Sequence, residues 1–217
     1  MAKTGKGKKP RGRFIVLEGI DGAGTTTQSR QLVEWLTGRG ELAIGTHQPT
    51  DGPIGNLIRQ ILRGRMVATP FDRSTEPVDP AAVALLFAAD RLDHIQNVIE
   101  PALRSGRHVI CDRYVVSSFA YQSLDTDLRF VRQINEKAFS PDLTLFLDVR
   151  AEVAMNRIEA SRTNKESFEQ LGTQKKVAAN YRKLLTEYRG SRVVTIDGED
   201  AQHNVSLKIR SEVEALL

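Results

Sequence analysis

The 217-residue sequence holds a single cysteine, Cys111, a single tryptophan, and only 6% aromatic residues. One cysteine excludes an internal disulfide framework. No apolar run approaches the roughly 20 residues that a transmembrane helix needs. No apolar segment follows the basic N-terminus, as it would in a secretory signal. We therefore expect a cytoplasmic protein without a membrane partner.

The net charge of +4 is unevenly distributed along the chain. The first 13 residues hold six basic side chains and no acidic one, and the rest of the chain has 25 basic and 27 acidic residues, a net charge of −2. A segment rich in glycine and lysine cannot bury apolar surface, so we expect residues 1–13 to form a disordered basic tail. No aromatic residue lies among these charges, which argues against specific nucleic-acid binding. A nucleic-acid-binding protein remains an alternative, and deleting residues 1–13 would test it.

Strand patterns alternate with helical patterns through the rest of the chain. This alternation indicates βαβ units, an α/β fold whose five-stranded, mainly parallel sheet is flanked by helices, in a single domain over residues 14–217. The longest helical pattern starts with Asp79 and Pro80, and Pro101 is expected to bend or break it near its C-terminal end. The expected strands cover 14–18, 41–46, 107–114, 142–149 and 192–197, and the expected helices cover about 25–40, 53–64, 79–106, 128–138, 150–160, 167–188 and the C-terminal segment.

A glycine-rich loop, GIDGAGTTTQ, follows the first strand at residues 19–28. The phosphate-loop pattern G-x-x-x-x-G-K-[ST] fits Gly19, Gly24 and Thr26, but Thr25 stands in place of the lysine. Backbone N–H groups and the positive end of the following helix can bind phosphate without that lysine. The alternative is a tight connection with no ligand. We predict a phosphate-binding loop with these members: Gly19, Gly22, Ala23, Gly24, Thr25, Thr26 and Thr27.

Further polar residues are expected at the same edge of the sheet, where ligands of parallel sheets bind. Asp112 and Arg113 end the third strand. A carboxylate there can hold Mg²⁺ together with the Thr26 hydroxyl, and an arginine can grip a phosphoryl group through its bidentate fork. Phe87 and Arg91 are four residues apart and share a helix face. From these residues alone, a core phenylalanine and a surface arginine are the simpler interpretation of that pair.

Six segments of the chain together resemble the thymidylate kinase family of P-loop nucleoside monophosphate kinases. They are VLEGIDGAGTTTQ, THQP, LLFAADR, CDRYVVSSFAYQ, PDLTLFLDV and SRTNKESFE, and the resemblance covers about residues 13–217. The pair FAADR and DRYVVSSFAYQ is its most specific part. The resemblance implies a three-layer P-loop kinase fold with a short lid at about 157–168. It also implies ATP and thymidine monophosphate (dTMP) as substrates, Mg²⁺ as cofactor, and a homodimer built through helices such as 79–106.

The resemblance also implies roles for individual residues. Phe87 would pack on the thymine ring, Arg91 would hydrogen-bond it, and Arg113 would bind the acceptor phosphate. Tyr121 would lie near the sugar, where its ring can exclude a ribose 2′-hydroxyl. The full implied substrate set is His47, Phe87, Arg91, Arg113, Ser117, Ser118, Tyr121 and Gln122. The lid would bring Arg157, Arg162 and Lys165 to ATP, and the implied catalytic residues are Asp21, Asp112, Arg113 and Arg162.

Three departures from the family pattern concern charge. Thr25 replaces the loop lysine, Gly22 stands where some members carry an arginine, and THQP replaces a common TREP. We expect Arg162, Arg157 or Lys165 to supply the missing charge. The predicted reaction is in-line transfer of the γ-phosphoryl group from ATP to dTMP, giving dTDP and ADP. The alternatives are a kinase of another nucleotide or of a deoxynucleoside, and a weakened relative that only binds nucleotide.

Overall fold

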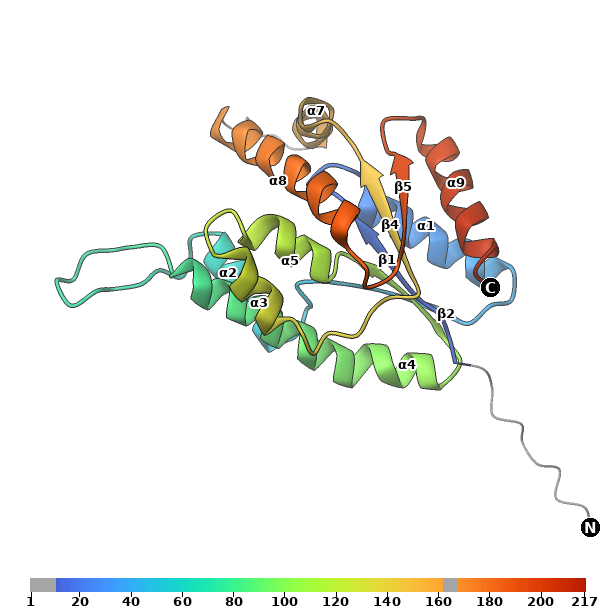
Figure 1. Cartoon of the computed structure of the whole chain (residues 1–217), viewed down its shortest axis with the longest axis horizontal. Helices are drawn as coiled ribbons and strands as arrows, with labels where there is room; N and C mark the ends of the chain where they lie inside the picture. The colour runs from blue at the N-terminus through green and yellow to red at the C-terminus, as the bar shows by residue number, and fades with distance from the viewer. Residues whose placement is uncertain (1–10, 162–167) are drawn as a thin grey trace, which may run out of the picture.

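The computed structural model describes residues 11–161 and 168–217 and contains a five-stranded sheet (Figure 1). The strand order is β2-β3-β1-β4-β5, and every pairing is parallel. This confirms the predicted α/β fold. The bounds of β1 and β5 match the predicted ranges, and the other strands differ by at most two residues at either end. The strands are β1 (Phe14–Glu18), β2 (Ala43–His47), β3 (His108–Asp112), β4 (Leu143–Asp148) and β5 (Arg192–Asp197).

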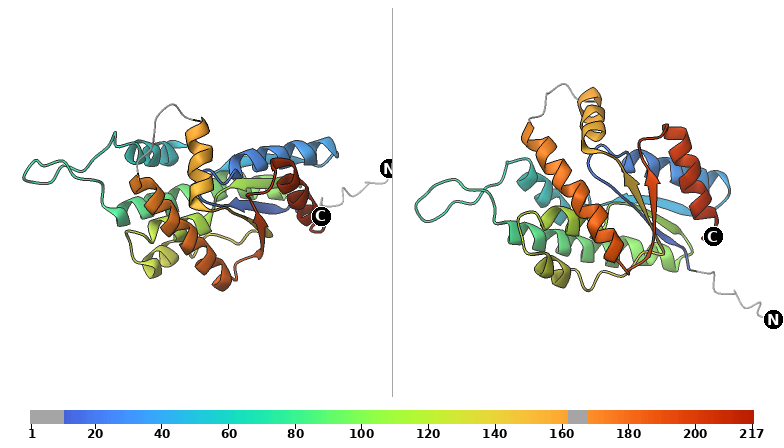
Figure 2. Two further views of the ribbon diagram at one scale, coloured as in Figure 1. Left: turned by 90° about the horizontal axis from the view of Figure 1, so that it is seen from above. Right: turned by 45° about the horizontal axis from the view of Figure 1, so that its top comes forward.

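Helices cover both faces of the sheet, which makes the three layers of the fold (Figure 2). On one face α1 packs against β1, β2 and β3, and α9 packs against α1 and β5. On the other face α4 contacts β3, and the Tyr181 ring of α8 stacks on Phe146 of β4. The helices are α1 (Thr25–Gly38), α2 (Pro53–Leu62), α3 (Pro80–His94), α4 (Glu100–Arg104), α5 (Val115–Gln122), α6 (Leu128–Ile134), α7 (Ala151–Ser161), α8 (Phe168–Glu187) and α9 (Gln202–Glu214).

The central strand β1 is buried along its whole length. A strand covered by helices on both faces needs a continuous apolar run, and Phe14 to Leu17 supply it. Glu18, the last residue of β1, is a buried acid at the edge of the sheet where the site lies.

The helical segment predicted over 79–106 is interrupted earlier than expected. Asp79 caps α3 by accepting a hydrogen bond from the Ala82 N–H at 3.0 Å. A π-helical turn, Ile95–Ile99, then separates α3 from α4, and Pro101 lies inside α4. Proline has no N–H, and its ring clashes with the carbonyl four residues earlier in a regular α-helix. The wider π turn spans the residues whose carbonyls would meet that ring, so the helix is distorted before the proline.

Residues 11–13, which the sequence assigned to the tail, pack against the domain. Arg11 forms an ion pair with Asp142 at 3.1 Å, and the Gly12 N–H donates to the Leu103 carbonyl at 2.9 Å. Over residues 11–161 and 168–217, no helix combines the length and hydropathy of a transmembrane span.

Candidate active site

The glycine-rich loop connects β1 to α1 with backbone geometry that requires glycine. Gly22 and Gly24 have φ angles of +80° and +97°, a region that glycine adopts without strain. A Cβ on Gly22 would lie 2.4 Å from the carbonyl oxygen of Ala154 in α7. The helix begins at Thr25, as predicted, so its unpaired N-terminal N–H groups follow directly after the loop.

A cavity of about 550 Å³ lies over this loop, and we call it the loop cavity. Among the described residues, Arg113 and Arg157 are the cationic side chains that line it. Nη2 of Arg157 donates to the Gly198 carbonyl at 2.9 Å, which holds the guanidinium at the cavity wall. Arg162 and Lys165 lie outside the described residues. The predicted loop members that line this cavity are Gly22, Ala23, Gly24, Thr25, Thr26 and Thr27, whereas Gly19 is not among the lining residues.

Thr26 and Asp112, the two predicted magnesium ligands, are in contact, although only Thr26 lines the loop cavity and Asp112 lines neither cavity. The Thr26 hydroxyl donates to Oδ2 of Asp112. The other carboxylate oxygen, Oδ1, is buried and has no hydrogen-bond partner in the described structure. A hydroxyl and a carboxylate oxygen are the ligand types that Mg²⁺ prefers. An unpartnered buried carboxylate oxygen also needs a positive partner, so these two residues fit a magnesium ion.

A second cavity, of about 770 Å³, lies beside the loop cavity. We call it the acceptor-side cavity. An arm between α2 and α3, which extends away from the body in Figures 1 and 2, contributes Met66 and Val67 to its wall. Asp21 and Arg113 line both cavities, so the two spaces meet at this pair. The predicted substrate residues that line the acceptor-side cavity are Phe87, Arg91, Arg113, Ser117, Ser118, Tyr121 and Gln122.

Arg91 is not a surface charge, because only 1% of its surface is exposed. Nε donates to Oε1 of Gln48 at 3.0 Å, and Nη2 donates to the Ser118 hydroxyl at 2.9 Å and the Tyr114 carbonyl at 3.1 Å. Nη1 donates to Oδ1 of Asn135. Burial lowers the pKa of Arg91 from its ordinary value. These bonds satisfy a buried guanidinium and fix its plane against the cavity.

Arg113 is held in a strained backbone conformation at the junction of the two cavities. Its φ angle is +68°, a value that costs a non-glycine residue roughly 1–2 kcal/mol. Nη2 donates to Oδ1 of Asp21 at 2.9 Å, and the guanidinium lies 5.1 Å from the centre of the Tyr121 ring. Burial opposes its charge, but nearby Tyr121, Tyr181 and Asp21 raise the pKa of Arg113 well above its ordinary value. Arg113 therefore stays charged where both cavities reach it.

Glu18 is a site residue that the sequence analysis missed. It is fully buried and accepts hydrogen bonds from the Tyr114 N–H, the Ser117 hydroxyl and the Tyr181 hydroxyl. Burial raises the pKa of this carboxyl, although the hydrogen bond from Ser117 and the charge of Arg113 oppose the rise. Glu18 thus anchors the groups that contact Arg113. The sequence feature that could have identified Glu18 is its place as the one charged residue at the end of an apolar strand.

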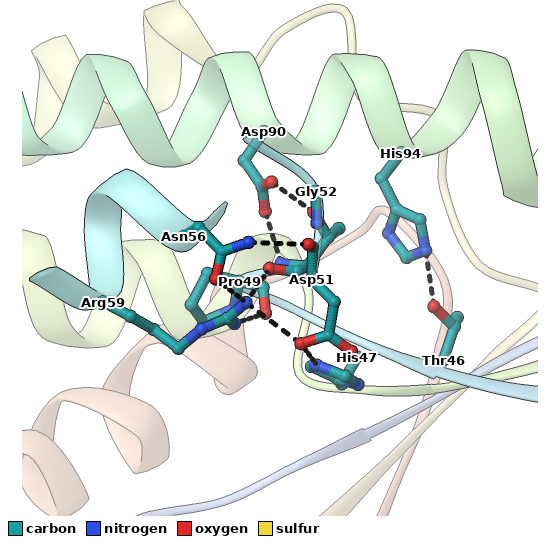
Figure 3. Close-up of polar contacts among 10 residues, drawn as sticks. Thr46, His47, Pro49, Asp51, Gly52, Asn56, Arg59, Asp90 and His94 are labelled. Atoms are coloured by element: carbon teal, nitrogen blue, oxygen red, sulfur yellow. Dashed lines mark hydrogen bonds and ion pairs between the residues drawn. The ribbon is translucent and has the colours of Figure 1, made fainter. Parts of the chain in front are cut away.

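His47 does not line either cavity. Its side chain is 47% exposed, and Nε2 lies 3.5 Å from Oδ1 of Asp51 (Figure 3). Gln48, the next residue, is buried and lines the acceptor-side cavity instead. Gln174 of α8 was also missed: its amide nitrogen donates to Oδ2 of Asp21 at 3.1 Å. No local sequence pattern could have identified Gln174, because 153 residues separate it from Asp21 and only the tertiary fold brings the two together.

Comparison with known proteins agrees with this geometry. The family model described as thymidylate kinase matches residues 17–209. A probable thymidylate kinase of Pyrococcus horikoshii is 40% identical over 209 residues, which cover 95% of this chain and 100% of that protein. The corresponding protein of Pyrococcus abyssi is 42% identical, over 85% of this chain and 88% of its own. That of Methanocaldococcus jannaschii is 40% identical, over 81% of this chain and 82% of its own. The chain therefore belongs to the thymidylate kinase family.

Proposed function

We propose that this protein transfers the γ-phosphoryl group of ATP to dTMP, giving ADP and dTDP. One observation carries the proposal: a loop cavity suited to phosphates and a larger acceptor-side cavity meet at Asp21 and Arg113. Two substrates that exchange a phosphoryl group need such a meeting point, because their reacting oxygens must lie in line. The names of the relatives, which are called thymidylate kinases, favour dTMP as the acceptor.

The loop cavity would hold the phosphates of ATP. Backbone N–H groups of the loop and the N-terminus of α1 provide the anion site. Thr26 and Asp112 would hold Mg²⁺, and the buried Oδ1 of Asp112 has no other partner in the described structure. When bound, the ion would neutralise charge on the phosphate oxygens. The described residues contain no group of three or more histidine, cysteine or acidic side chains that could hold a metal ion by themselves. An ion held by two protein groups, phosphates and water agrees with that sparse ligand set.

The acceptor-side cavity would hold dTMP with its base between Phe87 and the polar floor. Oε1 of Gln122 is buried without a hydrogen-bond partner in the described structure, so it can accept the N–H of a pyrimidine base. Tyr121, whose hydroxyl accepts the Asp21 N–H at 3.1 Å, would stand against the sugar. Arg113 would bind the acceptor phosphate, one oxygen of which attacks the γ-phosphorus of ATP while the bond to the bridging oxygen of ADP breaks.

A homodimer through α3 is part of this proposal. Leu85 and Leu92 are seven residues apart on α3, and 49% and 38% of their surfaces are exposed. Large apolar side chains repeating on one helix face are typical of a protein interface.

A cytoplasmic location follows from the proposed substrates, which are cytoplasmic metabolites.

A substrate panel tests the proposed function. Release of ADP is coupled to a spectroscopic readout, with dTMP, dUMP, UMP, dGMP and thymidine as acceptors, and dTDP is identified by chromatography. We expect the highest kcat/KM with dTMP. Activity confined to thymidine, with dTMP inert, would indicate a deoxynucleoside kinase. Nucleotide binding without ADP formation from any acceptor would indicate the weakened relative that Thr25 suggests.

A further inference from the structure

A continuous chain of hydrogen bonds, partly buried at Thr46 and buried beyond it, leads from the edge strand β2 to Arg91 in the acceptor-side cavity. His94 lies at its centre, and Figure 3 draws its bond to Thr46. Nε2 of His94 lies 2.7 Å from the Thr46 hydroxyl, and Nδ1 lies 3.1 Å from the amide nitrogen of Gln48. Oε1 of Gln48 then accepts from Nε of Arg91 at 3.0 Å. His94 itself lines neither cavity and is 2% exposed.

The direction of every bond in this chain follows from Arg91. A guanidinium can only donate, so Gln48 must present its oxygen to Arg91 and its NH₂ group to His94. Nδ1 of His94 must then be unprotonated in order to accept. A neutral imidazole with an unprotonated Nδ1 carries its proton on Nε2, which donates to the Thr46 hydroxyl. One tautomer of His94 therefore corresponds to one orientation of the Gln48 amide.

The opposite state of His94 would break the contact to Arg91. A proton on Nδ1 would face the NH₂ group of Gln48, and relief of that clash would turn the amide over. The NH₂ group would then face Nε of Arg91, which offers no acceptor. The surroundings also oppose a second proton on the ring: burial is the main cause that lowers the pKa of His94 to about 4, so the imidazole is neutral near pH 7. Of the charged groups nearby, His47 and Arg91 lower this pKa further, whereas Asp90 and Asp93 raise it.

Separate hydrogen bonds hold the backbone of the segment that follows Gln48, residues 49–50. Asp90, which lies one turn before His94 on α3, accepts from the Thr50 N–H at 2.8 Å and from the Thr50 hydroxyl at 2.6 Å. Arg59 donates to the Pro49 and Thr50 carbonyls (Figure 3). This segment therefore stays attached to α3 and α2 without His94. The specific effect left to His94 is the orientation of the Gln48 amide.

We propose that His94 is a positioning residue that acts through Gln48 to hold Arg91 in its binding orientation at the acceptor nucleotide. This role rests on the proposed function, because it assigns Arg91 to the acceptor. His94 touches neither substrate. It sets the hydrogen-bonding direction of the one side chain that binds Nε of Arg91.

Two substitutions of the same residue separate positioning from packing. His94→Leu introduces an apolar side chain of similar size and removes the acceptor for Gln48. His94→Asn keeps an acceptor oxygen close to the place of Nδ1. We expect the leucine variant to raise the KM for dTMP about tenfold, as loss of one oriented buried hydrogen bond would, with the KM for ATP unchanged. The asparagine variant should stay within about threefold of wild type.

A double-mutant cycle shows whether the effect passes through Gln48. Gln48→Met fills the same space but bonds to neither neighbour. In that background His94→Leu should cause no further rise in the KM for dTMP, because the residue through which it acts is gone. The proposal is overturned if the two changes are additive. It is also overturned if His94→Leu leaves the KM for dTMP unchanged, or raises both KM values equally.

A third variant and a spectroscopic measurement cover the remaining outcomes. If His94→Leu does not fold, Thr46→Val takes its place, since it leaves the buried Nε2–H of His94 without its acceptor and so favours the Nδ1–H tautomer. It should raise the KM for dTMP, and an unchanged value would refute the proposal. The ¹⁵N chemical shifts of the His94 ring should show the Nε2–H tautomer at neutral pH, and an Nδ1–H tautomer would refute the chain. A wild type that forms no dTDP refutes the proposed function, whereas the ring shifts test the hydrogen-bond chain without any turnover.

Discussion

We propose that Arg157 supplies the charge that the missing loop lysine would carry, and replacing it with alanine tests this. Position 25 of the loop is threonine, and Gly22 has no room for a side chain. Among the described residues, Arg113 and Arg157 are the cations that line the loop cavity. Arg113 is paired with Asp21 at the junction with the acceptor side. Arg157 is therefore the described cation best placed to bind the phosphates of ATP alone.

The size of the effect follows from the type of bond. A hydrogen bond between a charged donor and a phosphate contributes roughly 1.5–3 kcal/mol. Because each 1.36 kcal/mol is a factor of ten, the loss corresponds to about a ten- to hundredfold fall in kcat/KM for ATP. Arg157 is partly exposed, so solvent screening favours the lower end of that range. The loss of its bond to the Gly198 carbonyl affects a neutral partner and adds little to this effect.

The assay is coupled ADP release with ATP varied at saturating dTMP, and then with dTMP varied at saturating ATP. Arg157→Ala should lower kcat/KM for ATP and leave the KM for dTMP close to wild type. Arg192→Ala is the matched control. It removes an arginine whose ion pair with Glu212, at 2.5 Å, lies outside both cavities. Its kcat/KM should stay within about twofold of wild type.

A rescue experiment tests the same assignment in the opposite direction. If Arg157 replaces the lysine, then Thr25→Lys in the Arg157→Ala background should recover part of the lost kcat/KM, because a phosphate-binding cation returns to the loop. An Arg157→Ala variant that turns over within twofold of wild type would refute the assignment. A higher KM for dTMP with an unchanged kcat/KM for ATP would place Arg157 on the acceptor side instead.

Three further outcomes follow from single contacts. Asp112→Asn should raise the Mg²⁺ concentration needed for half-maximal activity, measured by titrating Mg²⁺ at fixed ATP, and an unchanged midpoint would exclude Asp112 as a ligand. Gly22→Ala should lower the melting temperature more than Gly24→Ala, because both positions have positive φ but only the Cβ at position 22 meets backbone within 4 Å; equal shifts would contradict this. The pKa of His94 is about 4 in the fold and 6.5 as its ordinary value, so the unfolded chain binds more protons between these values; stability should fall by up to about 3 kcal/mol as the pH drops from 6.5 to 4, and the difference between wild type and His94→Asn in pH-dependent unfolding measures it.

The parts of the fold that depend on local pattern could be predicted from the sequence. The apolar runs of β1 and β5 marked both strands, and the glycine loop marked the start of α1 at Thr25. The strand order could not be obtained in this way, because β1 pairs with β3 and β4 and not with its neighbour in sequence. The interruption of the long helix was predicted at Pro101 and found at Ile95–Ile99, since a proline distorts the turn before it.

In the candidate site, too, residues within local motifs could be predicted, whereas residues brought in by tertiary contact could not. Residues in motifs, such as Thr26 and Asp112, were predicted and lie together. Glu18 and Tyr181 were missed because 163 residues separate them in the chain, and only the packing of α8 on the sheet brings them into contact. His47 and Gln48 show the limit of transferring a pattern by position. The side chain next to the predicted one reaches the cavity, because alternate residues at the end of a strand point to opposite sides.

The missing lysine has a consequence for how the loop cavity must work. At position 25 the side chain is a short neutral threonine, and at position 22 the carbonyl of Ala154 excludes any side chain. The loop itself can therefore offer phosphate only its backbone N–H groups and neutral hydroxyls, and the described cations come from elsewhere: Arg157 from α7 and Arg113 from the residue after β3. Charge supplied from outside the loop acts on the phosphates only when those elements are correctly placed. In such a site, the affinity for ATP depends on the position of α7 as well as on the loop.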